Sequence, residues 1–277
     1  MFGAIIGDMV GSIYEFRNHR SKAFSLFGTG CHPTDDSIMT IAVAKAILEN
    51  DGKAEGLEEQ AVKWMQKIGR QYPNCGYGRS FRNWMFSNSP HPYGSFGNGS
   101  AMRVSACGWA GKTLEEVKAL SRAVTVVTHN HPEGVKGAEA TACAIFLART
   151  GHSKEEIRTF IEDNYYTLDF TIDEVRPTYE FSATCQRTVP QAIEAFLEST
   201  SFEDAIRSAI SLGGDSDTIA AITGSIAEAF YGIPEDIRKR AVDRFRYACK
   251  TFYTDAYPDL LSIVEAFEHK YGDKYIK

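Results

Sequence analysis

The chain has 277 residues, which is enough for a well-buried core in one large domain or two small ones. Its composition, 43% hydrophobic and 24% charged, is that of an ordinary soluble globular protein. The formal net charge of −6, without a block of like charges, argues against a nucleic-acid or membrane-surface partner. The six scattered cysteines form no CxxC pair, and neither a signal peptide nor a transmembrane run is visible, so we expect a cytoplasmic protein.

Helical periodicity dominates the chain, and local signals mark the start of several predicted helices. Thr113 with Glu116 and Ser153 with Glu156 form capping boxes, in which two side chains satisfy free backbone N–H groups. The run 217–231 is small or apolar nearly all round, which is typical of a helix buried in the core. The predicted helices cover 38–49, 113–128, 133–149, 153–163, 191–199, 202–212, 217–231, 235–249 and 258–270.

Prolines and glycines set the limits of some of these helices. Pro132 and Pro190 each suit a first helical position, where the missing N–H costs nothing. Gly213 and Gly214 are expected to end the helix over 202–212.

Little of the chain looks other than helical. Only 165–172 is strand-like, and 72–100 is predicted to be a long loop region around a short helical stretch. There is no linker, internal repeat or low-complexity segment. We therefore predict an all-α fold, a single compact multi-helix domain over 1–277.

Two short acidic segments, TDDS at 34–37 and DSDT at 215–218, each stand beside a predicted helix start. If the fold brings them together, four carboxylates share one pocket, which repels itself unless cations fill it. Two hard divalent ions such as Mg²⁺ or Mn²⁺ prefer oxygen ligands of this kind. Because Ser, Thr and Asp are also the preferred helix caps, either segment alone indicates a cap. The pair, with Gly213 and Gly214 leading into the second segment, favours a metal site.

The segment GSFGNGSAMR at 94–103 forms a Gly-rich loop running into a predicted helix that carries Ala101 and Met102. Backbone amides in such a loop can cradle phosphates. Alternatively, the same residues can form a flexible turn capped by Asn98 or Ser100. Phe96 can stack on a base or simply pack inward.

Two histidines, His129 and His131, precede Pro132 in an HxH pattern. This pattern can bind zinc, contact a ligand phosphate, or form a polar helix connection. The oxygen-rich segments elsewhere favour a hard metal and count against zinc. Near the N-terminus, Glu15 can serve as a general acid or base, or can be a surface carboxylate.

Several enzyme classes are excluded because the sequence lacks the motifs that define them. The His-Asp dipeptide of HD-type phosphohydrolases is absent, as is the GKS or GKT of P-loop enzymes. The DDxxD pattern of isoprenoid synthases fails, because Asp35-Asp36 is followed by Ser37, Ile38 and Met39. A purely structural interpretation, with every acidic segment a helix cap, stays open.

Six motifs in order resemble the ADP-ribosylglycohydrolases, the group containing dinitrogenase-reductase-activating glycohydrolase and the ADP-ribosylarginine and ADP-ribosylserine hydrolases. The similarity runs from about residue 3 to about residue 232, and it implies an all-α fold with a binuclear Mg²⁺ or Mn²⁺ site. The motifs are GDMVGSIYE (7–15), TDDS (34–37), GSFGNGSAMR (94–103), THNHPEG (128–134), TVPQAIEAFLES (188–199) and SLGGDSDTIAAITGSIAEAFYG (211–232).

The resemblance also implies roles for individual residues. Glu15 stands where the family has a flexible catalytic or gating glutamate, and Asp35 and Asp217 are expected to take part in catalysis. Ser216 replaces the threonine of many members, and the place of His131 is not shared by every branch. The metal ligands implied are Thr34, Asp35, Asp36, Asp215, Asp217 and Thr218. The expected ligand-binding residues are Gly94, Ser95, Phe96, Gly97, Asn98, Gly99, Ser100, Met102 and His129.

The implied reaction releases ADP-ribose from a modified protein or a small-molecule conjugate by cleaving the bond at C1″ of the terminal ribose. Arginine-linked ADP-ribose is the first choice of substrate, and serine-linked, O-acetylated or nucleic-acid-linked ADP-ribose would use the same anchor. A non-catalytic ADP-ribose binder or a structural, crystallin-like relative is the rival hypothesis.

Overall fold

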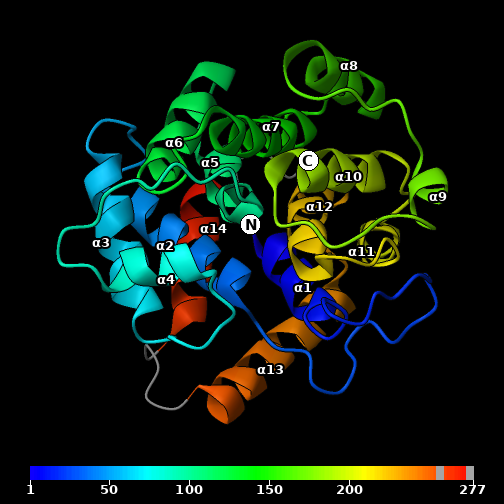
Figure 1. Cartoon of the computed structure of the whole chain (residues 1–277), viewed down its shortest axis with the longest axis horizontal. Helices are drawn as coiled ribbons and strands as arrows, with labels where there is room; N and C mark the ends of the chain where they lie inside the picture. The colour runs from blue at the N-terminus through cyan, green and yellow to red at the C-terminus, as the bar shows by residue number, and fades with distance from the viewer. Residues whose placement is uncertain (254–258, 273–277) are drawn as a thin grey trace.

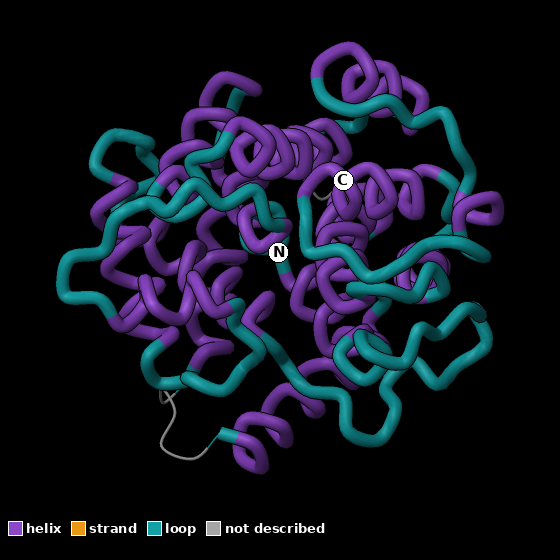
Figure 2. Tube along the Cα trace, viewed as in Figure 1, coloured by secondary structure: helices purple, strands orange, loops and turns teal. Residues whose placement is uncertain are grey.

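In the computed structural model, which describes residues 1–253 and 259–272, the architecture is helical (Figure 1). Loops join the helices (Figure 2), and the only extended pairing among the described residues is an isolated bridge between Gly97 and Thr184. The prediction of an all-α, single compact fold is confirmed. The α-helices are α1 (Phe2–Gly11), α2 (Asp35–Glu49), α3 (Leu57–Gly69), α4 (Arg79–Phe86), α5 (Ser105–Ala110), α6 (Leu114–Val126), α7 (Pro132–Arg149), α8 (Lys154–Asn164), α9 (Ile172–Val175), α10 (Cys185–Leu197), α11 (Phe202–Ile210), α12 (Ser216–Tyr231), α13 (Glu235–Phe252) and α14 (Leu260–Tyr271), and a 3-10 turn η1 spans Asn98–Ser100.

Local capping fixes the starts of three helices as predicted. The Thr113 hydroxyl accepts the Glu116 N–H at 3.2 Å, but Glu116 accepts the Lys112 N–H at 2.8 Å instead of that of Thr113, so the predicted box at α6 is only half formed. Ser153 and Glu156 form a complete reciprocal capping box at α8. Pro132 occupies the first position of α7. Each signal lies within a few residues of the start, so the sequence alone reveals it.

The predicted start at Pro190 is wrong, because α10 begins five residues earlier, at Cys185. Pro190 therefore lies inside the helix and cannot donate to the carbonyl of Gln186, four residues before it. The Gln186 carbonyl is therefore left without this helical hydrogen bond.

The predicted strand over 165–172 is also wrong. This segment is loop up to Thr171, and Ile172 begins α9. Burial does alternate, with Tyr166 and Leu168 buried and Thr167 exposed. The alternation arises because one side of an extended segment packs on the helices, and no strand in residues 1–253 and 259–272 pairs with it.

Three smaller differences concern helix limits. Ala101 and Met102 lie in a turn rather than in a helix, because α5 begins only at Ser105. Helices α1 and α3 were not predicted. The predicted helix over 258–270 corresponds to α14, and its residue 258 lies outside the described residues.

Helices α1 and α12 cross at the centre of the molecule with their backbones in contact (Figure 1). A Cβ on Gly7 would come within 2.7 Å of the Ala221 nitrogen, and nearer still to the Ala220 carbonyl. One turn further along α1, a Cβ on Gly11 would lie 2.7 Å from the Asp217 nitrogen. Spacing of four residues puts these glycines on one face of α1. The crossing brings the end of α1 against the start of α12.

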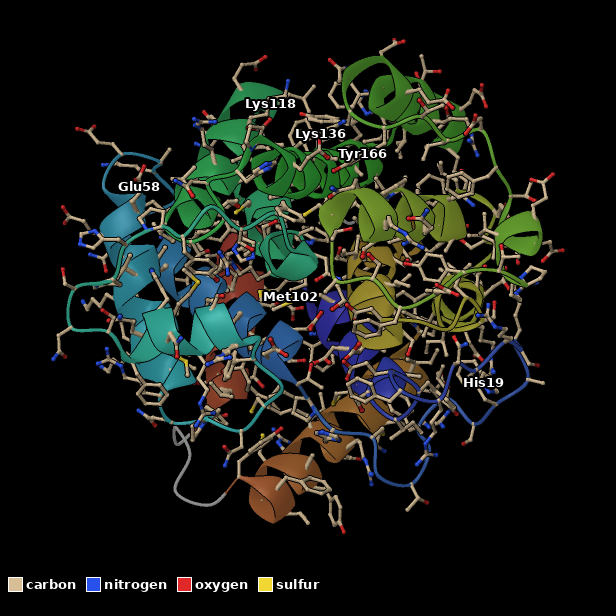
Figure 3. All side chains as sticks on the ribbon, in the orientation of Figure 1. His19, Glu58, Met102, Lys118, Lys136 and Tyr166 are labelled. Atoms are coloured by element: carbon tan, nitrogen blue, oxygen red, sulfur yellow. The ribbon has the colours of Figure 1, made fainter. Side chains whose placement is uncertain are left out.

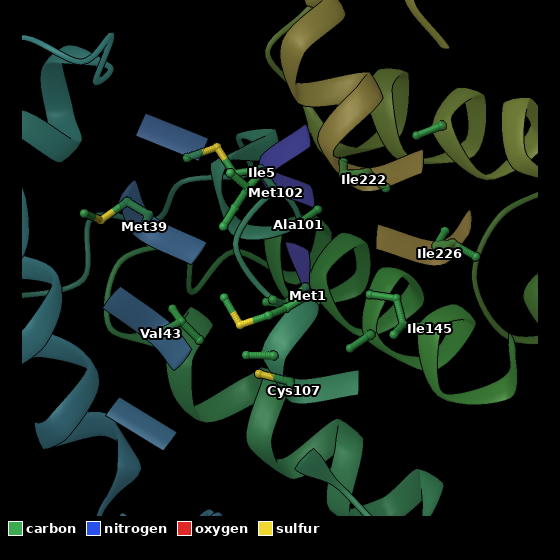
Figure 4. Close-up of a cluster of buried hydrophobic side chains, with 14 of the residues drawn as sticks. Met1, Ile5, Met39, Val43, Ala101, Met102, Cys107, Ile145, Ile222 and Ile226 are labelled. Carbon is green, nitrogen blue, oxygen red and sulfur yellow. The ribbon is translucent and has the colours of Figure 1, made fainter. Parts of the chain in front are cut away.

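The hydrophobic core surrounds this crossing (Figure 4). Met1 and Ile5 of the α1 segment pack with Val43 of α2, Ile145 of α7 and Ile222 of α12, and all five are essentially inaccessible to solvent. Burial of such side chains contributes ~1.5–3 kcal/mol each. The core thereby fixes the relative positions of the helices whose ends carry the acidic segments. Among the described residues, no helix has both the length and the apolar character that crossing a bilayer requires.

Candidate functional site

The two acidic segments meet in the structure, although 182 residues separate Asp36 from Thr218. The Thr218 hydroxyl donates to Asp36 Oδ2 at 3.3 Å. Asp8, Asp36 and Asp217 each offer a carboxylate oxygen within 4.8 Å of the others, and so do Glu15, Asp215 and Asp217. Asp217 is common to both groups, which we call the two carboxylate triads.

Asp8 organises the start of α2 from a distance. Its carboxylate accepts the Thr34 N–H at 2.8 Å, the Thr34 hydroxyl at 2.6 Å and the Ser37 N–H at 3.0 Å, and also the Ser37 hydroxyl. Thr34 in turn is the N-cap of α2 and accepts the Asp36 N–H at 3.4 Å. The acidic segment at 34–37 is thus both a helix cap and part of the cluster.

Asp8 is the residue that the sequence analysis missed. Its one signal is a charged residue inside the otherwise apolar helix FGAIIGDMVG, where a carboxylate has no local partner. Its side chain is fully buried. Its partners come from 26 and 29 residues away, so only the fold reveals the arrangement.

Asp35 is placed differently from the other acids. It is half-buried, its backbone N–H donates to the Cys75 carbonyl at 2.8 Å, and it belongs to neither triad. Its Oδ1 faces Gly76, where an added Cβ would lie 3.0 Å away, and the φ of +103° at Gly76 favours glycine. Burial, and then the fields of Asp8 and Asp215, raise the pKa of Asp35 well above its usual range.

Glu15 lies on the turn after α1 and reaches the acids of α12. Asn18, in the same turn with φ +50°, accepts the Gly214 N–H at 3.1 Å and so ties this turn to residues 213–214. Gly213 and Gly214 both have positive φ, a conformation that L side chains rarely adopt. Burial, followed by the charge of Asp215, raises the pKa of Glu15 to about 7.

The whole cluster is electrostatically crowded. Burial raises the pKa of Asp8 and Asp215, and raises that of Asp36 and Asp217 well above the usual range, where neighbouring carboxylates add to the effect. Asp36 Oδ1 is buried without a hydrogen-bond partner in the part of the chain that the structure describes. A buried, unpaired oxygen among like charges calls for a cation. The donor set, all carboxylate and hydroxyl oxygens, suits Mg²⁺ or Mn²⁺.

The Gly-rich loop is joined to the acidic cluster by Asn98. Its amide Nδ2 donates to Asp215 Oδ2 at 2.7 Å and to the Thr188 hydroxyl at 3.1 Å. The loop backbone pairs with the start of α10, because the Asn98 N–H donates to Ala183 at 2.9 Å and the Cys185 N–H to Phe96 at 3.0 Å. Asn98 is thus the link between the two parts of the candidate site.

The other predicted ligand-binding residues fall into two groups. Gly94 donates its N–H to Asn130 Oδ1 at 2.8 Å, Ser95 Oγ accepts the Gly97 N–H at 3.1 Å, and Phe96 is 43% exposed. Ser100 and Met102 are instead buried. The Ser100 hydroxyl donates to the Gly134 carbonyl at 2.8 Å, and Met102 packs in the core, near the centre of the side-chain view (Figure 3).

The two histidines, His129 and His131, have different surroundings and contacts. His129 is 5% exposed, and its Nε2 lies 3.3 Å and 3.5 Å from where a Cβ on Gly99 or Gly97 would stand. His131 caps α7 by accepting the Glu133 N–H at Nδ1, 3.1 Å away, and its ring lies 5.2 Å from that of Phe96. Neither histidine belongs to a possible metal group among the described residues.

Known proteins share this sequence and fold. ADP-ribosylhydrolase ARH3 of Mus musculus is 26% identical over 312 residues, covering 84% of this chain and 83% of its own. ADP-ribosylarginine hydrolase Tri1 of Pseudomonas putida (strain GB-1) is 27% identical over 288 residues, covering 87% and 73%. A solved ADP-ribosylglycohydrolase-related protein complex shares the fold with a TM-score of 0.65 at 19% identity, covering 97% of this chain and 95% of that chain. The ADP-ribosylglycohydrolase family profile matches residues 1–273, and the chain belongs to this family.

Proposed function

We propose that this ADP-ribosylglycohydrolase depends on two divalent cations and cleaves the bond at C1″ of the terminal ribose, releasing ADP-ribose from arginine on modified proteins. The observation that carries the proposal is the pair of carboxylate triads, since the two triads lie side by side and share Asp217. Such a cluster is strongly self-repelling when it is bare. The names of the relatives, which include an ADP-ribosylarginine hydrolase, support the reaction class.

The residues present fit the metal. Asp36 and Asp217 would hold one cation and Asp215 and Asp217 the other, with Asp35, Thr34 and Thr218 beside them. Bound Mg²⁺ or Mn²⁺ supplies positive charge to sugar hydroxyls and to an attacking water. Asp8 is already engaged by four donors, so it would chiefly position Thr34 and Ser37.

Glu15 is the best candidate for proton transfer. Its carboxylate lies within 4.8 Å of those of Asp215 and Asp217, so it can accept a proton from a water at the acidic cluster and return it to a leaving group. Such a group contributes ~10²–10⁴-fold in rate. The Gly-rich loop and His129 would bind the diphosphate away from the broken bond, so that binding energy orients the reacting end.

The charge of the site favours a cationic acceptor. Six ionised carboxylates would carry six negative charges and two divalent cations would carry four positive ones. Two negative charges would remain, which attract a guanidinium more than a neutral serine. The carboxylates are Asp8, Glu15, Asp35, Asp36, Asp215 and Asp217.

Two exposed aromatic rings beside the cluster support the same acceptor. Phe16, which follows Glu15, is 83% exposed, and its ring stacks on that of Phe181 at 6.1 Å. Phe181 is itself next to Gly214, since its Cα lies 3.4 Å from where a Cβ on Gly214 would stand. Exposed aromatic faces near negative charge bind planar cations.

The test is metal analysis combined with release assays on defined arginine-, serine- and acetyl-linked ADP-ribose substrates. We expect two divalent ions per chain, loss of turnover on chelation, and fastest release from arginine. Unchanged turnover after exhaustive chelation would refute the metal dependence. Faster release from serine or acetate would replace the acceptor, and tight ADP-ribose binding without release from any substrate would favour the non-catalytic alternative.

A further inference from the structure

Arg103 is a buried cation without an acidic partner. Its side chain is fully inaccessible to solvent, and no salt bridge joins it to a carboxylate within residues 1–253 and 259–272. Its guanidinium donates to the Thr128 hydroxyl at 2.7 Å and to the Val124 carbonyl at 3.1 Å. Because burying an unpaired charge is costly, we expect its hydrogen bonds to serve a function. Its shorter hydrogen bond, at 2.7 Å, is to the Thr128 hydroxyl, which in turn lies 2.7 Å from His129 Nδ1.

The proton of the Thr128 hydroxyl has one good destination. Arg103 can only donate, so the Thr128 oxygen accepts from it and its own hydrogen must go elsewhere. The Thr125 carbonyl is 3.4 Å away and already accepts the N–H groups of Thr128 at 3.1 Å and His129 at 2.9 Å. His129 Nδ1 lies only 2.7 Å away. Since a carbonyl oxygen has two lone pairs, the hydroxyl hydrogen goes to Nδ1.

An Nδ1 that accepts a hydrogen bond leaves the imidazole proton on Nε2. We propose that Thr128, held by Arg103, fixes His129 as the neutral Nε2–H tautomer, whose N–H donates to a phosphate oxygen of a ligand on the Gly-rich loop. The ligand part rests on the proposed function; the tautomer part does not.

The surroundings of Nε2 agree with a donor that waits for a ligand. Nothing in the described part of the chain hydrogen-bonds Nε2. It faces Gly97 and Gly99, whose missing side chains leave space beside it. Burial, and then the charge of Arg103, hold the pKa of His129 well below its usual range. Arg103 and Thr128 are therefore positioning residues, acting through the ring of His129.

The first test reads the tautomer directly from the ¹⁵N resonances of the imidazole in the unliganded protein. A protonated and a bare ring nitrogen resonate in well-separated regions, and His129→Gln identifies the signal among the seven histidines. We expect the proton on Nε2 in the wild type. We expect Thr128→Val and Arg103→Leu to populate both tautomers. A proton on Nδ1 in the wild type would overturn the assignment, and a single Nε2–H tautomer in both variants would remove the positioning roles.

The second test measures the dissociation constant of ADP-ribose by calorimetry. We expect Thr128→Val to weaken binding about tenfold or more, as for a lost hydrogen bond to a charged group, and Thr128→Ser to restore it. Thr125→Val is the matched control, because the buried Thr125 hydroxyl has no partner among the described residues and its loss leaves His129 untouched. Equal affinities in Thr128→Val and the control would overturn the donor role. A wild type with the Nε2 proton that fails to bind ADP-ribose would refute the ligand part and the proposed function together, whereas an Nδ1 proton with normal binding would refute the tautomer alone.

Discussion

The close crossing of α1 and α12 makes Gly7→Ala a sharp test of the fold. Ordinary carbon contacts begin at 3.4 Å, whereas the added Cβ would stand 2.7 Å from the Ala221 nitrogen. The helix backbones would have to part by about 0.7 Å there, and by more at the Ala220 carbonyl, because neither atom belongs to a flexible side chain. Overpacking of this kind costs ~1–3 kcal/mol, and backbone contact puts it at the upper end.

The cost is partly offset. Gly7 is helical without a positive φ, so alanine gains up to ~1 kcal/mol of helix propensity over glycine. We therefore expect Gly7→Ala to lower the free energy of unfolding by about 2 kcal/mol, measured by urea denaturation at constant m-value. Gly78→Ala is the control, since nothing lies within 4 Å of its Cβ and its φ is −57°. A Gly7→Ala protein as stable as the wild type, or stabilised by its propensity, would refute the tight crossing.

Four further predictions concern the site. Asp217→Asn should lower kcat by at least ~10²-fold and weaken Mn²⁺ binding in calorimetry, because both triads lose their common ligand, whereas exposed Asp243→Asn should change neither. Removing divalent ions should lower the midpoint of thermal unfolding, and Mg²⁺ at 100 times its dissociation constant should restore ~2.7 kcal/mol for each bound ion, or about 5 kcal/mol for two independent sites; an unchanged midpoint would argue against a folded-state site. Phe16→Ala should reduce kcat/KM for an arginine-linked substrate by about 2- to 5-fold relative to a serine-linked one, the size expected of an exposed ring, while Phe86→Ala, at a residue 48% exposed on α4, should leave the ratio alone. In the metal-free protein, the Glu15 contribution to stability should fall as pH rises from about 4.5 to about 7 and level off above that, because the folded-state pKa of Glu15, about 7, lies above its unfolded value of 4.5; Glu15→Gln should flatten this slope in urea titrations at successive pH values.

Sequence predicted best what is decided locally. The starts at Thr113 and Ser153 depend on hydrogen bonds to residues within the same turn, so the letters suffice. The strand over 165–172 failed because burial alternates along any extended surface segment, whether or not a partner strand exists. The predicted start at Pro190 was wrong because this proline lies inside α10, five residues after its first residue, so a proline alone does not locate the helix start.

The same difference between local and long-range contacts decides which parts of the site could be predicted. The two acidic segments are recognisable in the sequence, and the structure brings Asp36 and Thr218 into contact. Asp8 stayed hidden because its partners lie 26 and 29 residues away in the sequence. Asp35 falls outside both triads although it precedes Asp36, because consecutive residues of a helix point in different directions. Helix α1 was not predicted because three glycines and a buried acid disguise its apolar pattern.

The Asn98 amide, shared between the Gly-rich loop and Asp215, makes the two ends of the site one thermodynamic unit. A shift of the loop would leave the buried Oδ2 of Asp215 without its hydrogen bond to Asn98, and a rearrangement of Asp215 would remove the same hydrogen bond from the loop. We therefore expect an occupant of the acidic end that alters this hydrogen bond to change the affinity at the loop, and by reciprocity an occupant of the loop to return the same factor to the acidic end.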